Sequence, residues 1–207
     1  MYIVFKGIVG TGKTTQSKLL AKYLKSKFPN KKIIWAREPG GSEIADEIRK
    51  LVQGTKFEEK MNPLCETYLY AASRAQTLRE VVKPALDQGV IVIFDRSVFT
   101  SLSYQAASRG LGIDKVWKIN EAAVEGILPN IVLFFDLDIK TATQRTFDEG
   151  GDKFESMPEG FFKRARTGYK KVGKRKFGET RFITIDALGT IEEVQDRVNK
   201  VVFAKLN

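Results

Sequence analysis

The sequence predicts an α/β fold in which helices cover both faces of a five-stranded parallel sheet. Five short apolar segments, rich in β-branched and aromatic residues, recur along the chain, and segments with a helical period lie between them. Strands that are apolar on both faces are typical of a parallel sheet buried between helices. Alternation of such strands with helices is typical of α/β folds.

The predicted elements follow from this pattern in chain order. The strands are expected at residues 3–5, 33–36, 90–94, 131–137 and 182–185. The helices are expected at residues 13–27, 43–52, 63–88, 98–109, 114–126, 139–147, 158–172 and 190–203. The third helix has the clearest start, because Asn62 can cap it and Pro63 suits its first turn. Pro84 is expected to kink the same helix near its end.

The length of the chain favours a single domain. The chain has 207 residues, which fits a single domain at 1–207. No apolar run approaches the roughly 20 residues of a membrane span. The N-terminus lacks a signal-peptide pattern, so a cytoplasmic location is expected. One cysteine, Cys65, and no histidine argue against an internal disulfide, a zinc site and a Ser-His or Cys-His nucleophile.

The charge balance favours anionic partners. The chain has 35 Lys and Arg against 25 Asp and Glu, a formal charge of +10, which suits nucleotides or nucleic acids. The lysines between residues 18 and 32 have no interleaved aromatic residues for base stacking. They are better interpreted as a solvated helix face and turn, so nucleic acid is the less favoured partner.

A phosphate-binding loop is the strongest motif. Residues 7–14 match G-x-x-x-x-G-K-[ST] between a predicted strand and a predicted helix, as this motif requires. Its glycines let the backbone N–H groups face phosphates, its lysine neutralises them, and its last hydroxyl binds Mg²⁺. The residues expected to hold ATP are Gly7, Gly10, Thr11, Gly12, Lys13, Thr14 and Thr15. The motif narrows the fold class to a three-layer P-loop NTPase fold.

A carboxylate at the end of the third strand supports a magnesium site. Asp95 follows the apolar run 90–94, where it could hold Mg²⁺ together with Thr14. The alternative is that Asp95 only caps the strand end. Arg96, beside it, could reach a transferred phosphate.

Three further segments offer residues for a phosphoryl acceptor. Arg37 and a Pro-Gly-Gly turn follow the second strand, at the same sheet edge as the phosphate loop. Tyr70 and Arg74 stand four residues apart on one helix face, so they could offer a stacking ring and a donor together. Small hydroxyl residues follow Asp95 and lead to Tyr104 and Gln105.

Taken in order, these segments resemble the thymidylate kinase family. The resemblance is carried by residues 7–15, 37–41, 70–74, 95–96, 103–105, 109–111, 152–155, 164–169 and 185–187. It extends over nearly the whole chain. Single pieces are weak signals, whereas their order and spacing are specific.

The resemblance implies transfer of the γ-phosphoryl group of ATP to thymidine monophosphate in a homodimer. Arg37 and Arg96 would then hold the acceptor phosphate, and Asp186 would lie by ATP. The base site would comprise Tyr70 as the stacking ring, Arg74, Ser101 and Gln105 at the polar edge, and Tyr104 against the 2′ position. A short mobile lid at about 145–155 would supply the catalytic cations Arg145 and Lys153.

The sequence departs from the family around the acceptor. Val9 stands where relatives usually have an acidic residue that meets the sugar 3′-hydroxyl, and Lys6 replaces a common glutamate, which adds positive charge beside the nucleotides. Ser97 replaces a common tyrosine, and Glu149 falls where a lid arginine is expected. We therefore expect relaxed selectivity at the 3′ position and altered catalysis.

Two alternatives stay open. Asp95, Arg96 and Ser97 also resemble an element of deoxynucleoside kinases, so a deoxynucleoside or another monophosphate could be the acceptor. The chain could also be a regulatory or nucleic-acid-associated homologue with weak catalysis. A basic cluster favours this modestly, although a solvated helix end explains it better: Lys170, Lys171, Lys174, Arg175 and Lys176.

Overall fold

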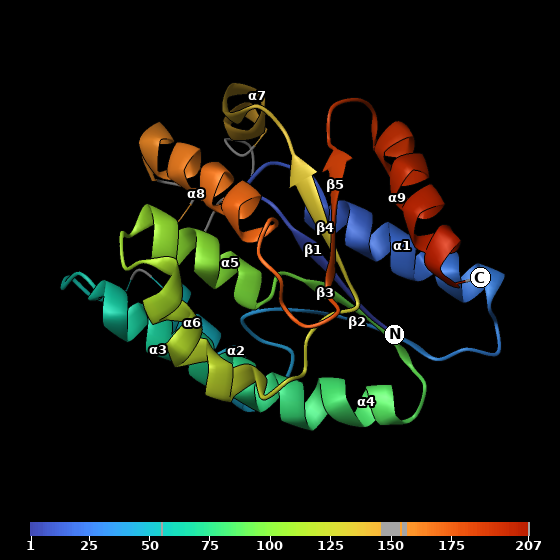
Figure 1. Cartoon of the computed structure of the whole chain (residues 1–207), viewed down its shortest axis with the longest axis horizontal. Coiled ribbons are helices and arrows are strands. Elements are labelled where there is room, and N and C mark those ends of the chain that lie inside the picture. The colour runs from blue at the N-terminus through green and yellow to red at the C-terminus, as the bar shows by residue number, and fades with distance from the viewer. Residues whose placement is uncertain (55, 146–153, 155–156, 207) are drawn as a thin grey trace.

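The computed structural model describes residues 1–54, 56–145, 154 and 157–206. Its strands are β1 (Tyr2–Lys6), β2 (Ile33–Arg37), β3 (Ile91–Asp95), β4 (Ile131–Asp136) and β5 (Arg181–Asp186). They form one parallel sheet in the order β2-β3-β1-β4-β5 (Figure 1). The predicted fold class is therefore confirmed, and each predicted strand differs from the observed one by a residue or so at its ends.

The register of the strands brings three predicted site segments to one edge. Phe5 of β1 and Arg37 of β2 both stand opposite Asp95 of β3. The phosphate loop follows β1 directly, so it emerges beside the ends of β2 and β3. This edge is where ligands bind in open α/β sheets.

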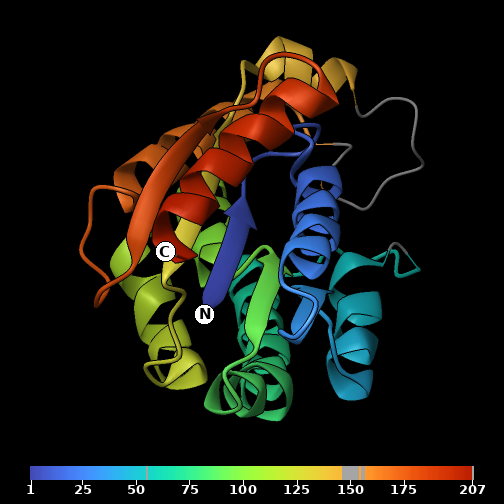
Figure 2. The same ribbon diagram turned by 90° about the vertical axis from the view of Figure 1, so that its right-hand side faces the viewer.

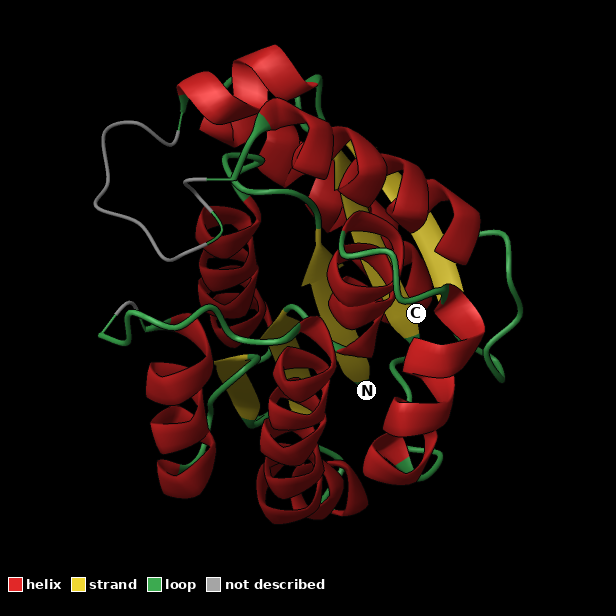
Figure 3. Cartoon of the chain, turned by 90° about the vertical axis from the view of Figure 1, so that its left-hand side faces the viewer, coloured by secondary structure: helices red, strands yellow, loops and turns green. Residues whose placement is uncertain are grey.

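Helices surround the sheet on both faces (Figure 3). Those after β1 and β2 are α1 (Lys13–Lys27), α2 (Glu43–Gln53), α3 (Pro63–Thr77) and α4 (Lys83–Asp87). Those after β3 and β4 are α5 (Val98–Ser103), α6 (Ile113–Val124), α7 (Ile139–Gln144) and α8 (Glu159–Val172), and α9 (Ile191–Leu206) follows β5. No helix in the described part of the chain is long and apolar enough to cross a membrane.

Two predicted helices contain a π-helical segment. The helix expected at 63–88 consists of α3, a π segment η1 (Leu78–Val82) and α4. Pro84 has no N–H to donate, and η1 ends just before it, so the irregularity lies on the N-terminal side of the expected kink. The helix expected at 98–109 becomes α5 followed by a second π segment, η2 (Tyr104–Ser108).

Each face of the sheet has its own apolar core. On one face α1 and α9 lie side by side (Figure 2) and contribute Leu20, Leu24 and Val198. On the other face, η1 and α5 bury Val82 and Phe99, among others. Packing on both faces fixes the central strand β1, whose five residues are all buried, and so fixes where the phosphate loop begins.

Candidate active site

The phosphate loop takes a conformation that its glycines allow. Gly10 and Gly12 have φ of 73° and 77°, a left-handed region that favours glycine. A Cβ on Gly10 would lie 1.7 Å from the backbone oxygen of Ala142 in α7. The loop is therefore packed tightly against α7, and α1 begins at Lys13 with its N-terminus facing the loop.

Thr14 and Asp95 meet beside this loop. The Thr14 hydroxyl donates a hydrogen bond to Oδ2 of Asp95, and Asp95 Oδ1 is buried without a hydrogen-bond partner among the described residues. Hydroxyl and carboxylate oxygens are ligands that Mg²⁺ prefers, with phosphates and water completing its shell. The described residues contain no group of three acidic, cysteine or histidine side chains that could hold a metal alone. The pair fits a magnesium ion that a phosphate also binds.

Arg96 is held in an unusual backbone conformation. Its φ is 77°, which is costly for a residue other than glycine and is found most often at functional sites. Its Nη1 lies 3.5 Å from the Gly7 oxygen, and its guanidinium carbon lies 5.3 Å from the centre of the Tyr104 ring. Arg96 thus lies between the phosphate loop and the predicted base site.

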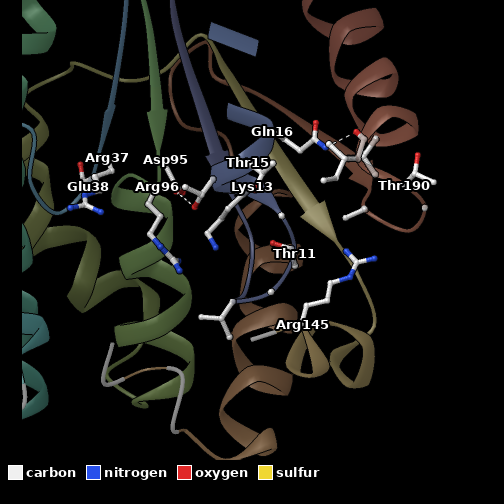
Figure 4. A pocket seen from close by; sticks show the side chains of 18 of the residues that line it. Thr11, Lys13, Thr15, Gln16, Arg37, Glu38, Asp95, Arg96, Arg145 and Thr190 are labelled. Atoms are coloured by element: carbon white, nitrogen blue, oxygen red, sulfur yellow. Dashed lines mark hydrogen bonds between the residues drawn. The ribbon is translucent and has the colours of Figure 1, made fainter. Parts of the chain in front are cut away.

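A cleft of about 590 Å³ runs along this sheet edge (Figure 4). Arg37 and Arg96 lie at one end, Arg145 and Thr190 at the other, and Lys13 between them. The predicted residues that line the cleft are Gly10, Thr11, Gly12, Lys13, Thr14, Thr15, Arg37, Asp95, Arg96 and Arg145. The structure therefore brings the predicted phosphate-binding residues together, while their roles stay predictions.

A second, narrower cavity adjoins the cleft. The two share Glu38, Gln53 and Arg96 as lining residues. Its volume of about 20 Å³ has room for about one water molecule. The predicted base-site residues that line it are Tyr70, Arg74, Arg96, Ser101, Tyr104 and Gln105.

The aromatic residue Phe154 also lines this second cavity. Its ring centre lies 5.2 Å from that of Tyr104 and 6.4 Å from that of Tyr70, and Phe154 is itself buried. A cavity of about 20 Å³ is too small for a pyrimidine ring, so a base would enter only after lining side chains such as Phe154 moved apart.

Arg74 is more deeply buried than its predicted role suggests. It has 1% of its surface exposed, and its Nε donates to Oε1 of Glu38 at 2.9 Å. Its Nη atoms donate to Glu38, to Asn120 and, at 3.2 Å, to Ser101. Burial raises the pKa of Glu38, and the adjacent Arg74 opposes this shift. Protein acceptors therefore fix the guanidinium in the cavity wall.

Lys6 does not lie beside the nucleotide cleft as the sequence suggested. It is fully buried, with Nζ 4.5–5.8 Å from the ring centres of four aromatic residues: Phe99, Phe134, Tyr169 and Phe182. Burial lowers the pKa of Lys6 to about 7. Tyr169 in turn donates a hydrogen bond to the oxygen of Gly7 at 3.3 Å. The Lys6 side chain is therefore packed among aromatic rings, one of which hydrogen-bonds the first residue of the phosphate loop, and it does not line the cleft.

Some predicted residues lie elsewhere. Gly7 begins the loop, but it does not line the cleft. Asp186 is exposed and accepts a hydrogen bond from the backbone N–H of Leu188 at 3.0 Å, so it caps the turn after β5. Lys153, Glu149 and most of the predicted lid lie outside the described residues.

Sequence reasoning missed several cleft residues. Arg49 and Gln53 stand four apart on α2 and line the cleft together with Glu38. Their spacing on one helix face was a usable signal, because residues at i and i+4 share a face. Ile191, whose backbone oxygen accepts from Gln16 at 2.8 Å, lines the far end, and no motif marks it.

Comparisons with known proteins agree with this geometry. The family model for thymidylate kinase matches residues 5–198. A thymidylate kinase of Thermosipho melanesiensis is 36% identical over 207 residues, the whole of both chains. One of Finegoldia magna is 41% identical over 195 residues, 94% of this chain and 93% of the relative. The crystal structure of thymidylate kinase from Ehrlichia chaffeensis has a TM-score of 0.77 at 28% identity and covers 98% of each chain. The chain therefore belongs to the thymidylate kinase family of nucleoside monophosphate kinases.

Proposed function

We propose that this protein transfers the γ-phosphoryl group of ATP to thymidine monophosphate and gives thymidine diphosphate. The observation that carries the proposal is the pair of adjoining cavities, which share Glu38, Gln53 and Arg96. One contains the phosphate loop, and the other is lined by aromatic and polar side chains suited to a base. A kinase of this kind must bind two nucleotides with their phosphates facing each other.

Different residues of the cleft would bind the two nucleotides. Lys13 is held within the loop, where its Nζ donates to the Ile8 oxygen at 3.2 Å, so its charge would lie against the phosphates of ATP. Arg37 and Arg96 would bind the acceptor phosphate, since a guanidinium group can donate two parallel hydrogen bonds to phosphate oxygens. Thr14 and Asp95 would hold Mg²⁺, which when bound neutralises charge on the β and γ phosphates. Arg145 would add charge from the opposite end.

A panel of acceptors tests this function. The protein would be incubated with ATP, Mg²⁺ and each nucleoside monophosphate or thymidine, and the products would be identified by mass spectrometry. Thymidine diphosphate should be the main product, and the Lys13→Ala variant should form little of it. Faster phosphorylation of thymidine would indicate a deoxynucleoside kinase. Binding of ATP without any transfer would indicate a regulatory homologue.

We also propose that two copies form a homodimer through α2 and α3. These helices pack together, yet Ile44, Leu51 and Tyr68 expose 58%, 37% and 56% of their surfaces. Large exposed apolar side chains on neighbouring helices mark interaction surfaces. Sedimentation velocity should show twice the chain mass of 23.3 kDa, and Tyr68→Glu should give monomers. A wild-type monomer at micromolar concentration would contradict the proposal. The expected cytoplasmic location stays a prediction.

A further inference from the structure

Glu66 lies behind the wall of the second cavity and contacts one of its lining residues. It is on α3, has none of its surface exposed, and does not itself line the cavity. Its Oε1 accepts a hydrogen bond from Nε2 of Gln105 at 2.7 Å. Its Oε2 lies 3.1 Å from Nη2 of Arg109, which neutralises the buried carboxylate. Gln105 is 1% exposed, so these contacts set how its amide is turned.

The chemistry of Glu66 decides the orientation of that amide. The oxygen and nitrogen of a glutamine amide are assigned from their hydrogen-bond partners. An ionised carboxylate can only accept hydrogen bonds. The NH₂ group of Gln105 must therefore face Glu66, which turns its carbonyl oxygen the other way. Because Gln105 lines the cavity, the wall there presents an acceptor.

Arg74 lines the same cavity and presents hydrogen-bond donors to it, whereas Gln105 presents an acceptor. A guanidinium has five N–H donors and no acceptor, and Glu38, Asn120 and Ser101 hold it in place. The Asn120 amide is itself oriented, because its Nδ2 donates to the Val116 oxygen at 2.7 Å. The wall therefore has a fixed donor at Arg74 and a fixed acceptor at Gln105.

We propose that Glu66 is a positioning residue that makes the cavity select a base whose edge carries a carbonyl beside a ring N–H. This inference rests on the proposed function. Thymine and uracil carry a carbonyl oxygen at C4 and a ring N–H at N3, which complement a donor and an acceptor. Cytosine carries an amino group at C4 and an unprotonated N3, so both of its groups would face the wrong partner. Discrimination by hydrogen bonds left unpaired is strong, because buried polar groups then lose their partners.

Deoxyuridine and deoxycytidine monophosphates test this inference, because they differ only at that edge. The ratio of their kcat/KM values would be measured for the wild type and for Glu66→Gln, whose amide lets Gln105 turn over. We expect the ratio to fall about tenfold or more in Glu66→Gln, with an unchanged KM for ATP. Glu66→Asp keeps a carboxylate and should retain more of the preference.

Thr67→Val is the matched control, because Thr67 is also buried on α3 and its hydroxyl donates only to the Pro63 oxygen, at 2.8 Å. It should leave the ratio unchanged. An unchanged ratio in a folded Glu66→Gln protein would overturn the inference. If that variant does not fold, slow hydrogen exchange of the Gln105 side-chain amide in the wild type supports the contact, and fast exchange overturns it.

The two proposals can fail separately. If no pyrimidine monophosphate is phosphorylated, the proposed function fails, while calorimetric binding of the two nucleotides still tests the orientation of Gln105. If transfer occurs and Glu66→Gln leaves the preference unchanged, only the inference fails.

Discussion

The Thr14 hydroxyl donates a hydrogen bond to Asp95 across 81 residues of sequence. The contact joins the first turn of α1 to the end of β3, two elements that the sheet register places side by side. It also holds together the two oxygen groups that we propose as Mg²⁺ ligands, which would lower the cost of ordering them.

Asp95→Asn should separate metal binding from nucleotide binding. The amide keeps the shape of the side chain and an oxygen for Thr14, but it removes the charge that Mg²⁺ needs. We expect turnover to fall about 100-fold or more, with the magnesium dependence shifted to higher concentration and metal-free ATP binding retained. Asp87→Asn, which breaks only the exposed pair with Lys83, is the control. Equal turnover in the two variants would contradict the magnesium role.

Gly10→Ala should weaken ATP binding more than its backbone strain explains. Gly10 and Gly89 have nearly the same φ, 73° and 71°, so an alanine at either position costs about 1–2 kcal/mol of strain. A Cβ at Gly89 meets nothing within 4 Å, whereas one at Gly10 collides with Ala142. We expect the φ-related loss of stability to be similar in both variants, whereas the collision should further destabilise Gly10→Ala and lower its ATP affinity at least tenfold. Calorimetry would measure the ATP affinity of both variants. An unchanged affinity in Gly10→Ala would show that the loop can move away from Ala142 without losing its ATP-binding conformation.

Lys6→Met should stabilise the protein, and more so at low pH. The pKa of Lys6 falls from its usual 10.5 to about 7 in the fold, so the unfolded chain binds the extra proton between these values. Because of this group, the free energy of unfolding rises with pH from about 7 to 10.5, and below pH 7 the contribution of Lys6 no longer changes with pH. We expect the variant to be more stable by on the order of 3 kcal/mol at pH 6, with the difference shrinking above pH 7.

Urea unfolding at pH 6, 7.5 and 9 would measure this difference. Lys22→Met, on the exposed face of α1, is the control and should show no such trend. A constant difference across the three pH values would mean that Lys6 does not titrate in this range.

Features set by neighbouring residues could be predicted from the sequence, whereas contacts between distant segments could not. The strands and the phosphate loop are encoded in contiguous residues, so apolar runs and one motif located them. The contact of Arg74 with Asn120 joins α3 to α6, and no local pattern links these residues. The π segment η1 also has no signature in helical spacing, because Leu78 to Val82 keep an ordinary helical composition. Local order was therefore predictable, whereas the buried polar contacts were not.

A double-mutant cycle on Glu38 and Arg74 should show strong coupling. Glu38→Gln leaves a guanidinium buried without its counter-charge, which typically costs about 3–5 kcal/mol. Arg74→Met leaves Glu38 free to take up a proton, since burial already raises its pKa. The double variant should therefore be more stable than the sum of the single effects predicts.

Urea unfolding of the four proteins would measure the coupling. The control is the exposed pair of Lys50 and Glu47, whose side chains are 71% and 70% accessible. The coupling free energy of this pair should be less than about 1 kcal/mol. Equal costs for Glu38→Gln and Glu47→Gln would refute a structural role for the buried pair.

Val9 should relax selectivity at the 3′ position of the acceptor sugar. Val9 lies within the phosphate loop and lines the cleft, and its side chain cannot accept a hydrogen bond from a 3′-hydroxyl. We expect the wild type to use thymidine monophosphate and its 3′-deoxy analogue with kcat/KM values within about tenfold of each other, since an unmade hydrogen bond changes rates little when no buried group is left unpaired. Val9→Asp restores an acceptor and should raise the preference for the 3′-hydroxyl, while Val9→Ala, which has none, should not. A wild-type preference as strong as that of Val9→Asp would show that another group already binds the 3′-hydroxyl.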